Sequence, residues 1–313
     1  MTRIGMTVSE TVLISVVIPA YNYAKTLPRA AESVLSQLDE CSELIIIDDG
    51  STDETPLVVA DLAARFPAQF RGIRQSNAGL AAVRNRGIEE AKGRYLVFLD
   101  ADDEMCSNAL FFLRQHISRY PDTQFIIGGH VSVFPDGRES RKLPDSLPET
   151  PLERVRSYLL DKTLRLSNGA CAMDRDVFSQ GGYPEHFRNA EDIPVFAQVL
   201  AGYKCAVLNA PLARIYKHDD SLRHNLAYGM QIGDRLVAEV FDTGRLPESM
   251  SILRQAFLAQ RYLSLFRTCA AAGKRKDGLE FYFFALKNDW RAFFRFSYTR
   301  KALKLIFSFE KDG

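Results

Sequence analysis

The sequence has few cysteines and no cysteine pair of the kind that builds a cross-link or a zinc site. Its 313 residues include five cysteines, which are odd in number, scattered and free of any CxxC spacing: Cys41, Cys106, Cys171, Cys205 and Cys269. A disulfide framework and a structural zinc site are therefore disfavoured, and a reducing cytoplasm is the compartment that fits best.

A net charge, a long apolar run and a dinucleotide fingerprint are also missing. The 40 Lys and Arg residues balance 39 Asp and Glu, so we expect no nucleic-acid partner. No uncharged apolar stretch approaches the roughly 20 residues that cross a bilayer. The run Thr11–Ala20 follows an acidic residue and contains Pro19, which favours a first strand over a signal peptide. No GxGxxG follows an early strand, which disfavours a dehydrogenase. We expect a cytoplasmic protein that is at most peripheral at the inner face of the cytoplasmic membrane.

What the first half does contain is an alternation of strand and helix patterns. Apolar runs predict buried strands at 13–19, 44–47, 72–74 and 95–99, separated by helical spacing at 26–38, about 53–65 and 83–91. Thr52 or Asp53 is expected to cap the second of these helices. This alternation predicts an α/β fold with a mostly parallel central sheet flanked by helices. In such sheets ligands bind beyond the carboxyl ends of the strands.

The second half predicts a less regular continuation of the same domain. Helical patterns cover 107–119, 152–162 and 193–201, and strands are expected at 124–134, 169–173, 205–208 and 213–216. The Pro- and charge-rich stretch 135–151 suits a mobile flap. Beyond residue 227 the pattern is helical, so we divide the chain into 1–225 and a helical region, 226–313.

Carboxylates gather where the most apolar strand ends. The run Tyr95–Leu99 is followed by Asp100, Asp102 and Asp103, which repel one another and raise one another's pKa. Side chains at i and i+2 of an extended chain point the same way, and hard oxygen ligands suit Mg²⁺ or Mn²⁺. The alternative is that Asp102 or Asp103 caps the next helix. Taken alone, the cluster leaves the two readings about even.

A second pair of carboxylates, Asp48 and Asp49, ends the strand 44–47. A strand-to-helix turn explains the glycine and serine that follow, but it does not explain two consecutive carboxylates. One of them can accept hydrogen bonds from a base or a ribose. Tyr21 can stack on a ring or pack against the protein, and Arg84 can be an ordinary ion pair or a cation beside a nucleotide.

Four motifs in this order and spacing resemble those of the family 2 inverting glycosyltransferases of GT-A fold. They are Val16–Asn22, Ile46–Asp53, Asn77–Gly87 and Leu99–Asp103, and the resemblance covers about residues 12–220. It implies a nucleotide-binding half at about 12–105 and an acceptor half at about 106–225. The donor-binding residues that it implies are Pro19, Tyr21, Asn22, Asp49, Asn77, Arg84, Asp100, Ala101 and Asp102.

The resemblance also implies a metal and a catalytic base. Asp100 and Asp102 resemble the DxD motif that holds Mn²⁺ or Mg²⁺, and His218 resembles a histidine that reaches the metal or the diphosphate, although ligand and bystander remain equal readings for it. Asn189–Asp192 resembles the acceptor-side motif in which Asp192 is the base and Glu191 supports it. The alternative for this acidic pair is stabilisation of a helix N-terminus.

The function implied is metal-dependent inverting transfer of a sugar from a nucleotide-diphosphate sugar, UDP or dTDP type favoured, to a hydroxyl group. The implied acceptor is a glycan or lipid-linked glycan of the bacterial envelope, such as lipopolysaccharide. Two rivals remain. A sugar-1-phosphate nucleotidyltransferase would want a Gly-rich basic loop where this chain has Pro19–Asn22, and a catalytically silent carbohydrate-binding homologue would have lost the acidic motifs.

The helical region carries no catalytic motif but interleaves cations with aromatic residues. Across 274–311, basic runs alternate with Phe281–Phe284, Trp290–Phe296 and Arg300–Phe307. Such a segment can lie at a membrane interface. It can equally pack on the catalytic core or form a contact between copies in an oligomer.

Overall fold

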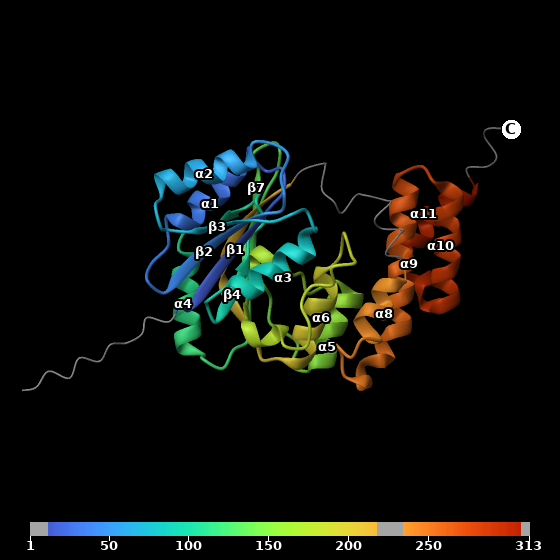
Figure 1. Cartoon of the computed structure of the whole chain (residues 1–313). Helices are drawn as coiled ribbons and strands as arrows, with labels where there is room; N and C mark the ends of the chain where they lie inside the picture. Colours follow the sequence, from blue (N-terminus) through green and yellow to red (C-terminus); the bar gives the residue numbers. More distant parts are fainter. Residues whose placement is uncertain (1–11, 218–233, 308–313) are drawn as a thin grey trace, which may run out of the picture. The chain divides into compact units, whose positions relative to one another are not determined.

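A computed structural model describes residues 12–217 and 234–307 of the chain. The backbone contacts divide it into two compact units (Figure 1). The first unit comprises residues 12–147, 166–185 and 203–217, and the second comprises 148–165, 186–202 and 234–307. The second unit thus combines the C-terminal helices with two segments from within 1–225. The functional division at residue 225 stays a prediction.

The first unit is built on one sheet with the order β3-β2-β1-β4-β8-β6-β9-β5, and β7 pairs with β6. Its strands are β1 (Ile14–Ala20), β2 (Ser42–Asp48), β3 (Arg71–Arg74), β4 (Tyr95–Phe98), β5 (Glu104–Met105), β6 (Phe125–Val133), β7 (Glu139–Lys142), β8 (Cys171–Asp174) and β9 (Cys205–Tyr216). The longest ladders are parallel: β1 pairs with β2 from Ile14 to Ala20, and β6 pairs with β9 from Phe125 to Val133. The antiparallel ladders β4–β8 and β5–β9 join two residue pairs each.

Helices cover both faces of this sheet. Alternate residues of β1, such as Val16 and Ile18, share a core with α1 (Leu27–Leu35), α2 (Thr55–Arg65) and α4 (Ala109–Arg119). On the other face Val17 meets α3 (Leu80–Glu90), which approaches so closely that only a glycine, Gly87, fits at the contact. Residues 95–99 are fully buried, as expected for a strand covered on both sides. The predicted α/β fold is confirmed.

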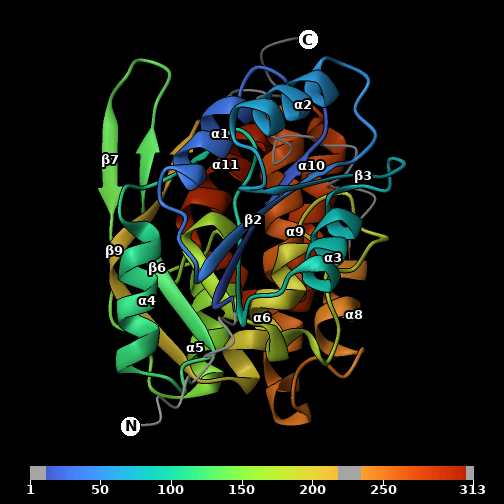
Figure 2. The same ribbon diagram turned by 60° about the vertical axis from the view of Figure 1, so that its left-hand side comes forward.

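Several predicted boundaries were wrong for identifiable reasons. The expected strands 205–208 and 213–216 are one strand, β9, which continues through Pro211. The pairing of β6 with β9 accommodates this by a shift of register near Gly129. Part of the predicted flap forms β7, which Figure 2 shows beside the rest of the sheet. The helix α2 begins at Thr55 with Glu54 at its cap position, so neither Thr52 nor Asp53 occupies it.

The second unit is helical. Its elements are α5 (Pro151–Arg156), a π-helical turn η1 (Ser157–Asp161), α6 (Asp192–Gly202), α8 (Arg235–Phe241), η5 (Glu248–Leu253), α9 (Arg254–Ala271), α10 (Arg275–Asn288), η6 (Trp290–Phe294) and α11 (Phe296–Phe307). A capping box between Thr150 and Glu153 starts α5. Leu263, Phe266 and Tyr282 form the core of α9 and α10. Among the described residues, no helix combines the length and the hydrophobicity that a bilayer crossing needs.

The contact at Gly87 predicts an asymmetry between two glycines. A Cβ atom at residue 87 would lie 2.6 Å from Val17 Cγ1, whereas a Cβ atom at Gly202, the last residue of α6, would meet nothing within 4 Å. We expect Gly87→Ala to destabilise the protein by about 1–3 kcal/mol, because overpacking outweighs the better helix propensity of alanine. Gly202→Ala, the control, is expected to leave stability unchanged or slightly raised. Thermal unfolding measures both, and equal shifts would show that the α3–β1 contact yields freely.

Candidate functional site

The loops that follow β1 and β2 are joined through Asn22. This residue has a left-handed backbone (φ 61°), which asparagine tolerates better than most residues. Its side-chain oxygen accepts a hydrogen bond of 2.8 Å from the backbone amide of Thr52, and its own backbone amide donates to Ser51 Oγ at 2.9 Å. Asn22 therefore holds the turn Gly50–Asp53 against the end of β1.

The buried carboxylate of Asp49 holds the loop between β3 and α3. Its oxygens accept hydrogen bonds from the amides of Ala78 (2.9 Å) and Gly79 (2.8 Å) and from Gln75 Nε2 (2.9 Å). The side-chain amide of Asn77 donates to the Asp49 carbonyl oxygen at 3.1 Å. Three N–H donors converge on one buried carboxylate, and these hydrogen bonds fix the path of residues 75–79.

The neighbouring carboxylate, Asp48, faces the edge strand β3. Its Oδ1 accepts from the Ser51 amide at 2.9 Å, and its Oδ2 lies 3.3 Å from Arg74 Nε. Between the two loops lies Gly50, with φ +73°, where a Cβ atom would be 2.9 Å from the Asn77 nitrogen. Only glycine allows this approach, so the tips of β1, β2 and β3 are bonded to one another.

The acidic cluster lies at the end of β4. Arg84 of α3 is buried, with 4% of its side chain exposed, and its Nη2 lies 3.0 Å from Asp100 Oδ1. Its guanidinium carbon is also 5.2 Å from the centre of the Tyr183 ring. The next helix, α4, begins only at Ala109, after β5, so Asp102 and Asp103 do not cap it.

The carboxylates act electrostatically on two neighbouring groups. Burial, reinforced by Asp100 and Asp102, raises the pKa of Asp103 to about 8, although its carboxylate accepts a 2.9 Å hydrogen bond from the Tyr216 amide. Burial, then Asp102, Asp100 and Asp103, raise the pKa of the Tyr23 hydroxyl well above its usual value. The end of β4 is thus a region of negative potential.

Arg29 of α1 contacts the acidic loop that follows β4. Its Nη2 donates to the Asp102 carbonyl oxygen at 2.5 Å, its Nε lies 3.2 Å from Glu104 Oε1, and its guanidinium carbon lies 3.7 Å from the centre of the Tyr216 ring. Arg214 of β9 lies 3.2 Å from the other oxygen of Glu104. The backbone of the acidic loop is therefore fixed between α1 and the end of β9.

The donor site expected from the sequence falls on connected elements of the first unit. Pro19 lies in β1, Tyr21 (44% exposed) just beyond it, and Ala101 is buried between the aspartates. Asn22, Asp49 and Asn77 bond chiefly to neighbouring loops, and Arg84 pairs with Asp100. Sequence reasoning assigned no role to Tyr23 or Arg29. Tyr23 lies in the turn Ala20–Tyr23, which could have signalled it, whereas no local pattern marks Arg29.

The predicted base and its neighbour belong to the second unit. Asp192 is the first residue of α6, Glu191 before it is buried, and Ala190 has a left-handed backbone (φ 63°). The pKa of Lys162 is lowered to about 8, first because the surrounding protein removes water from the ammonium group and then because Arg261 repels it. The Asp192 carboxylate raises this pKa. Lys162 keeps contact with solvent. An ammonium group thus interacts electrostatically with the predicted base.

The described residues contain no group of three or more His, Cys, Asp or Glu side chains arranged to hold a metal ion. His218, the third predicted ligand, lies outside the described residues. The donor set of Asp100 and Asp102 nevertheless fits Mn²⁺ or Mg²⁺, because it offers hard oxygen atoms in a region where like charges crowd. Two carboxylates fit a divalent ion that takes its other ligands from phosphate and water.

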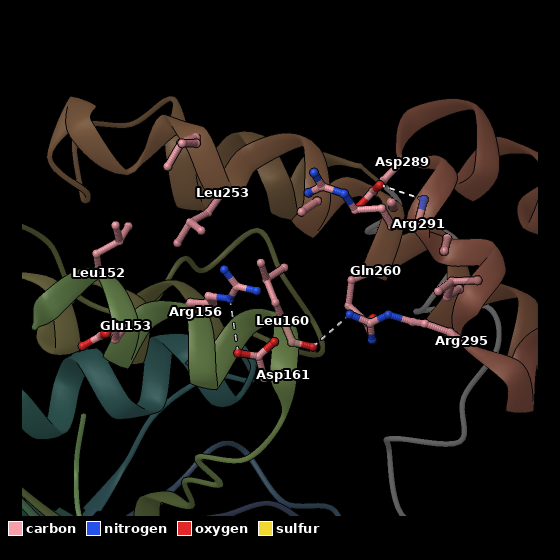
Figure 3. A pocket seen from close by; sticks show the side chains of 15 residues that line it. Leu152, Glu153, Arg156, Leu160, Asp161, Leu253, Gln260, Asp289, Arg291 and Arg295 are labelled. Atoms are coloured by element: carbon pink, nitrogen blue, oxygen red, sulfur yellow. Dashed lines mark hydrogen bonds and ion pairs between the residues drawn. The ribbon is translucent and has the colours of Figure 1, made fainter. Parts of the chain in front are cut away.

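A cavity of about 450 Å³ lies within the second unit (Figure 3). Arg156 and Arg295 are among its lining residues, but Arg156 pairs with Asp161 at 3.4 Å and Arg295 donates to the Leu160 carbonyl at 3.3 Å. No predicted site residue lines it. This cavity is separate from the features that the sequence motifs mark.

The sequence of this chain is similar to those of proteins of one known family. Residues 15–182 match the family model described as glycosyl transferase family 2. The succinoglycan biosynthesis protein ExoO of Rhizobium meliloti is 31% identical over 208 residues, which are 62% of this chain and 58% of ExoO. Matches to four other curated relatives span 26–40% of their lengths.

Two solved structures share the fold. The TarS fragment 1–349 of S. aureus, in complex with UDP-GlcNAc, has a TM-score of 0.65 at 18% identity and covers 94% of this chain and 89% of its own. A mannosyltransferase of Pyrobaculum calidifontis, in complex with GDP-Man and Mn²⁺, has a TM-score of 0.55 at 18% identity, covering 95% and 88%. At this identity the likeness confirms the GT-A fold alone.

The bonds of Asp49 predict a local loss of order when its charge is removed. Asp49→Asn keeps one acceptor oxygen but sets an NH₂ group against an N–H donor, so we expect the amides of residues 78 and 79 to exchange about tenfold faster or more. Hydrogen-exchange mass spectrometry of this loop measures the effect. The matched control is Asp61→Asn on α2, whose side chain is 65% exposed. Unchanged exchange in Asp49→Asn would mean that the carboxylate does not hold the loop.

Proposed function

The chain belongs to glycosyl transferase family 2, and from this premise we propose that it transfers a sugar from a nucleotide-diphosphate sugar to a hydroxyl acceptor. One observation in the structure supports the proposal most: the joined loops of β1, β2 and β3 and the acidic end of β4 lie at the carboxyl end of the same parallel strands. That edge is where α/β sheets bind their ligands.

The donor would lie against the first unit. Tyr21 is exposed beyond β1 and can stack on a base, and the loop fixed by Asp49 can present Asn77 to the nucleotide. We assign the same donor-binding role to Pro19, Asn22, Arg84 and Ala101. A UDP- or dTDP-type donor is our preferred class, supported by the UDP-GlcNAc complex of the TarS fragment.

Asp100 and Asp102 would hold Mn²⁺ or Mg²⁺, with His218 as a further candidate ligand. When bound, such an ion neutralises the charge that develops on a diphosphate leaving group. Arg84 holds the Asp100 carboxylate through its ion pair, and Arg29 holds the Asp102 backbone. Arg84 therefore orients one carboxylate and Arg29 fixes the backbone that carries the other, which reduces the reorganisation needed at the moment of reaction.

Transfer needs a base for the acceptor. The bond between sugar C1 and the phosphate oxygen breaks, a new bond forms between C1 and the acceptor oxygen, and Asp192 takes the hydroxyl proton. Attack from the side opposite the leaving group inverts the configuration at C1. Glu191 would support the base. The succinoglycan biosynthesis protein ExoO supports an envelope glycan as the acceptor class.

Removal of one proposed metal ligand tests the donor site. We expect Asp102→Asn to abolish the gain in UDP affinity on adding Mn²⁺, a loss of about tenfold or more, since changing even a residue that only hydrogen-bonds a metal ligand costs that much. Calorimetry of UDP with and without Mn²⁺ measures it. The control is Asp122→Asn, whose side chain is 82% exposed. A retained Mn²⁺ effect would remove Asp102 from the metal site.

Removal of the proposed base separates chemistry from binding. We expect Asp192→Asn to bind UDP with Mn²⁺ normally but to transfer sugar about 10²- to 10⁴-fold more slowly, the usual contribution of a general base. The control is Asp234→Asn, an exposed aspartate before α8. A screen of UDP-, dTDP- and GDP-sugars identifies the donor for this assay, and NMR of the product reports the anomer. An unaffected rate would assign the base elsewhere.

A further inference from the structure

The second unit exposes an aromatic cluster at η6. Trp290, Phe293 and Phe294 are 67%, 50% and 54% exposed. Their rings touch edge to face, with centroids 5.6 Å apart for Trp290 and Phe294 and 5.8 Å apart for Phe293 and Phe294. Single exposed apolar residues are ordinary, but three touching aromatic rings form a patch of the kind that marks an interaction site.

The helix that follows, α11, exposes an apolar stripe of its own. Phe296, Leu303 and Phe307 are 75%, 45% and 69% exposed, and their spacing of seven and four residues places them on one face of the helix. The core of the unit uses a different face, on which Thr299 and Ala302 are buried. Folding therefore leaves this stripe uncovered.

Cations alone accompany these apolar residues. Between Trp290 and Phe307 the sequence has five Arg and Lys residues and no Asp or Glu, although the whole chain is balanced at 40 to 39. Arg295 turns inward and bonds to Gln260 and the Leu160 carbonyl. The other four are exposed, and none forms an ion pair with another described residue: Arg291, Arg300, Lys301 and Lys304.

We propose that this surface, made of Trp290, Phe293, Phe294 and the exposed faces of Phe296, Arg300, Leu303, Lys304 and Phe307, docks on an anionic lipid bilayer. Aromatic and aliphatic side chains enter the headgroup region, while arginine and lysine reach the lipid phosphates. The positive charge of this surface favours an anionic bilayer over a second copy of the chain. A two-fold contact with a second copy would bring like cations together, whereas an anionic surface neutralises them.

The structure narrows the segment that the sequence suggested, 274–311. Tyr282 in α10 is buried in the core, and Phe281 stacks on Tyr262 with centroids 6.2 Å apart. Arg275 bonds to the Ile306 carbonyl at 3.1 Å. Phe281, Tyr282 and Arg275 of α10 thus support the fold, whereas Phe283 and Phe284 are 53% and 39% exposed. Residues 308–311 lie outside the described part of the chain.

The chain carries its own probe for this docking, because its one tryptophan is Trp290. The full chain is mixed with vesicles of phosphatidylcholine containing phosphatidylglycerol, and separately with vesicles of phosphatidylcholine alone. We expect sedimentation with the anionic vesicles, a blue shift of tryptophan emission and protection from acrylamide quenching. Phosphatidylcholine vesicles are expected to bind weakly, and added salt to release the protein.

Matched variants separate the apolar and the charged contributions. Phe296→Ser/Phe307→Ser and Arg300→Glu/Lys304→Glu change only exposed side chains, so thermal unfolding is expected to stay unchanged. Each is expected to lower vesicle affinity, by about fivefold or more for each charge removed. The controls are Leu57→Ser, 70% exposed on α2, and Lys92→Glu/Lys142→Glu, which are exposed in the first unit.

Every other outcome overturns the proposal. These outcomes are no sedimentation, equal binding to both vesicle types, sedimentation without a change at Trp290, and binding that survives both variants. Sedimentation equilibrium without lipid tests the second-copy alternative: a dimer that dissociates in Phe296→Ser/Phe307→Ser would assign the surface to that contact. None of these readouts requires sugar transfer, so the docking can fail while the proposed function stands.

Discussion

A buried negative charge controls the geometry of the loops at the strand ends. Without its three N–H donors, the buried Asp49 carboxylate would lack hydrogen-bond partners, which is costly in the interior. Without the carboxylate, the turn before α3 would lose the acceptor for two adjacent backbone amides. The buried side chain and the path of residues 75–79 therefore depend on each other. Asn22 and Gly50 extend the same dependence to the loops of β1 and β2.

The end of β4 shows the opposite electrostatic arrangement. Three aspartates crowd together, and the two arginines that contact this loop, Arg29 and Arg84, do so from α1 and α3. Arg84 reaches a carboxylate, whereas Arg29 reaches a backbone carbonyl, so much of the negative potential remains. Burial and then the neighbouring Asp100 and Asp102 raise the pKa of Asp103 to about 8. In the donor site that we propose, these like charges at one edge of the sheet are where the divalent cation would bind.

The sequence predicted the strands of the first half well because their signal is local. Tyr95–Leu99 is an unbroken apolar run, and the structure buries all of it. It predicted less well where long-range pairing decides: Pro211 interrupts the apolar pattern of β9 without ending the strand. The polar residue types indicated where the loops lie, but the sequence did not show which residues they would bond to. Arg29 and Asp102 are 73 residues apart, and nothing in either segment signals the contact. Likewise, Asn22 and Asn77 were expected to face a nucleotide, and their bonds to neighbouring loops could only be seen in the fold.

The hydrogen bonds of Asp49 determine which substitutions its loop can tolerate during evolution. Two of the three donors are main-chain amides, which almost any amino acid supplies, while the side chains at 76 and 78 point into solvent. Substitutions at those two positions can change the surface of the loop without removing the hydrogen bonds that hold its backbone. If the donor lies against this loop, as we propose, its specificity can diverge without a new loop conformation.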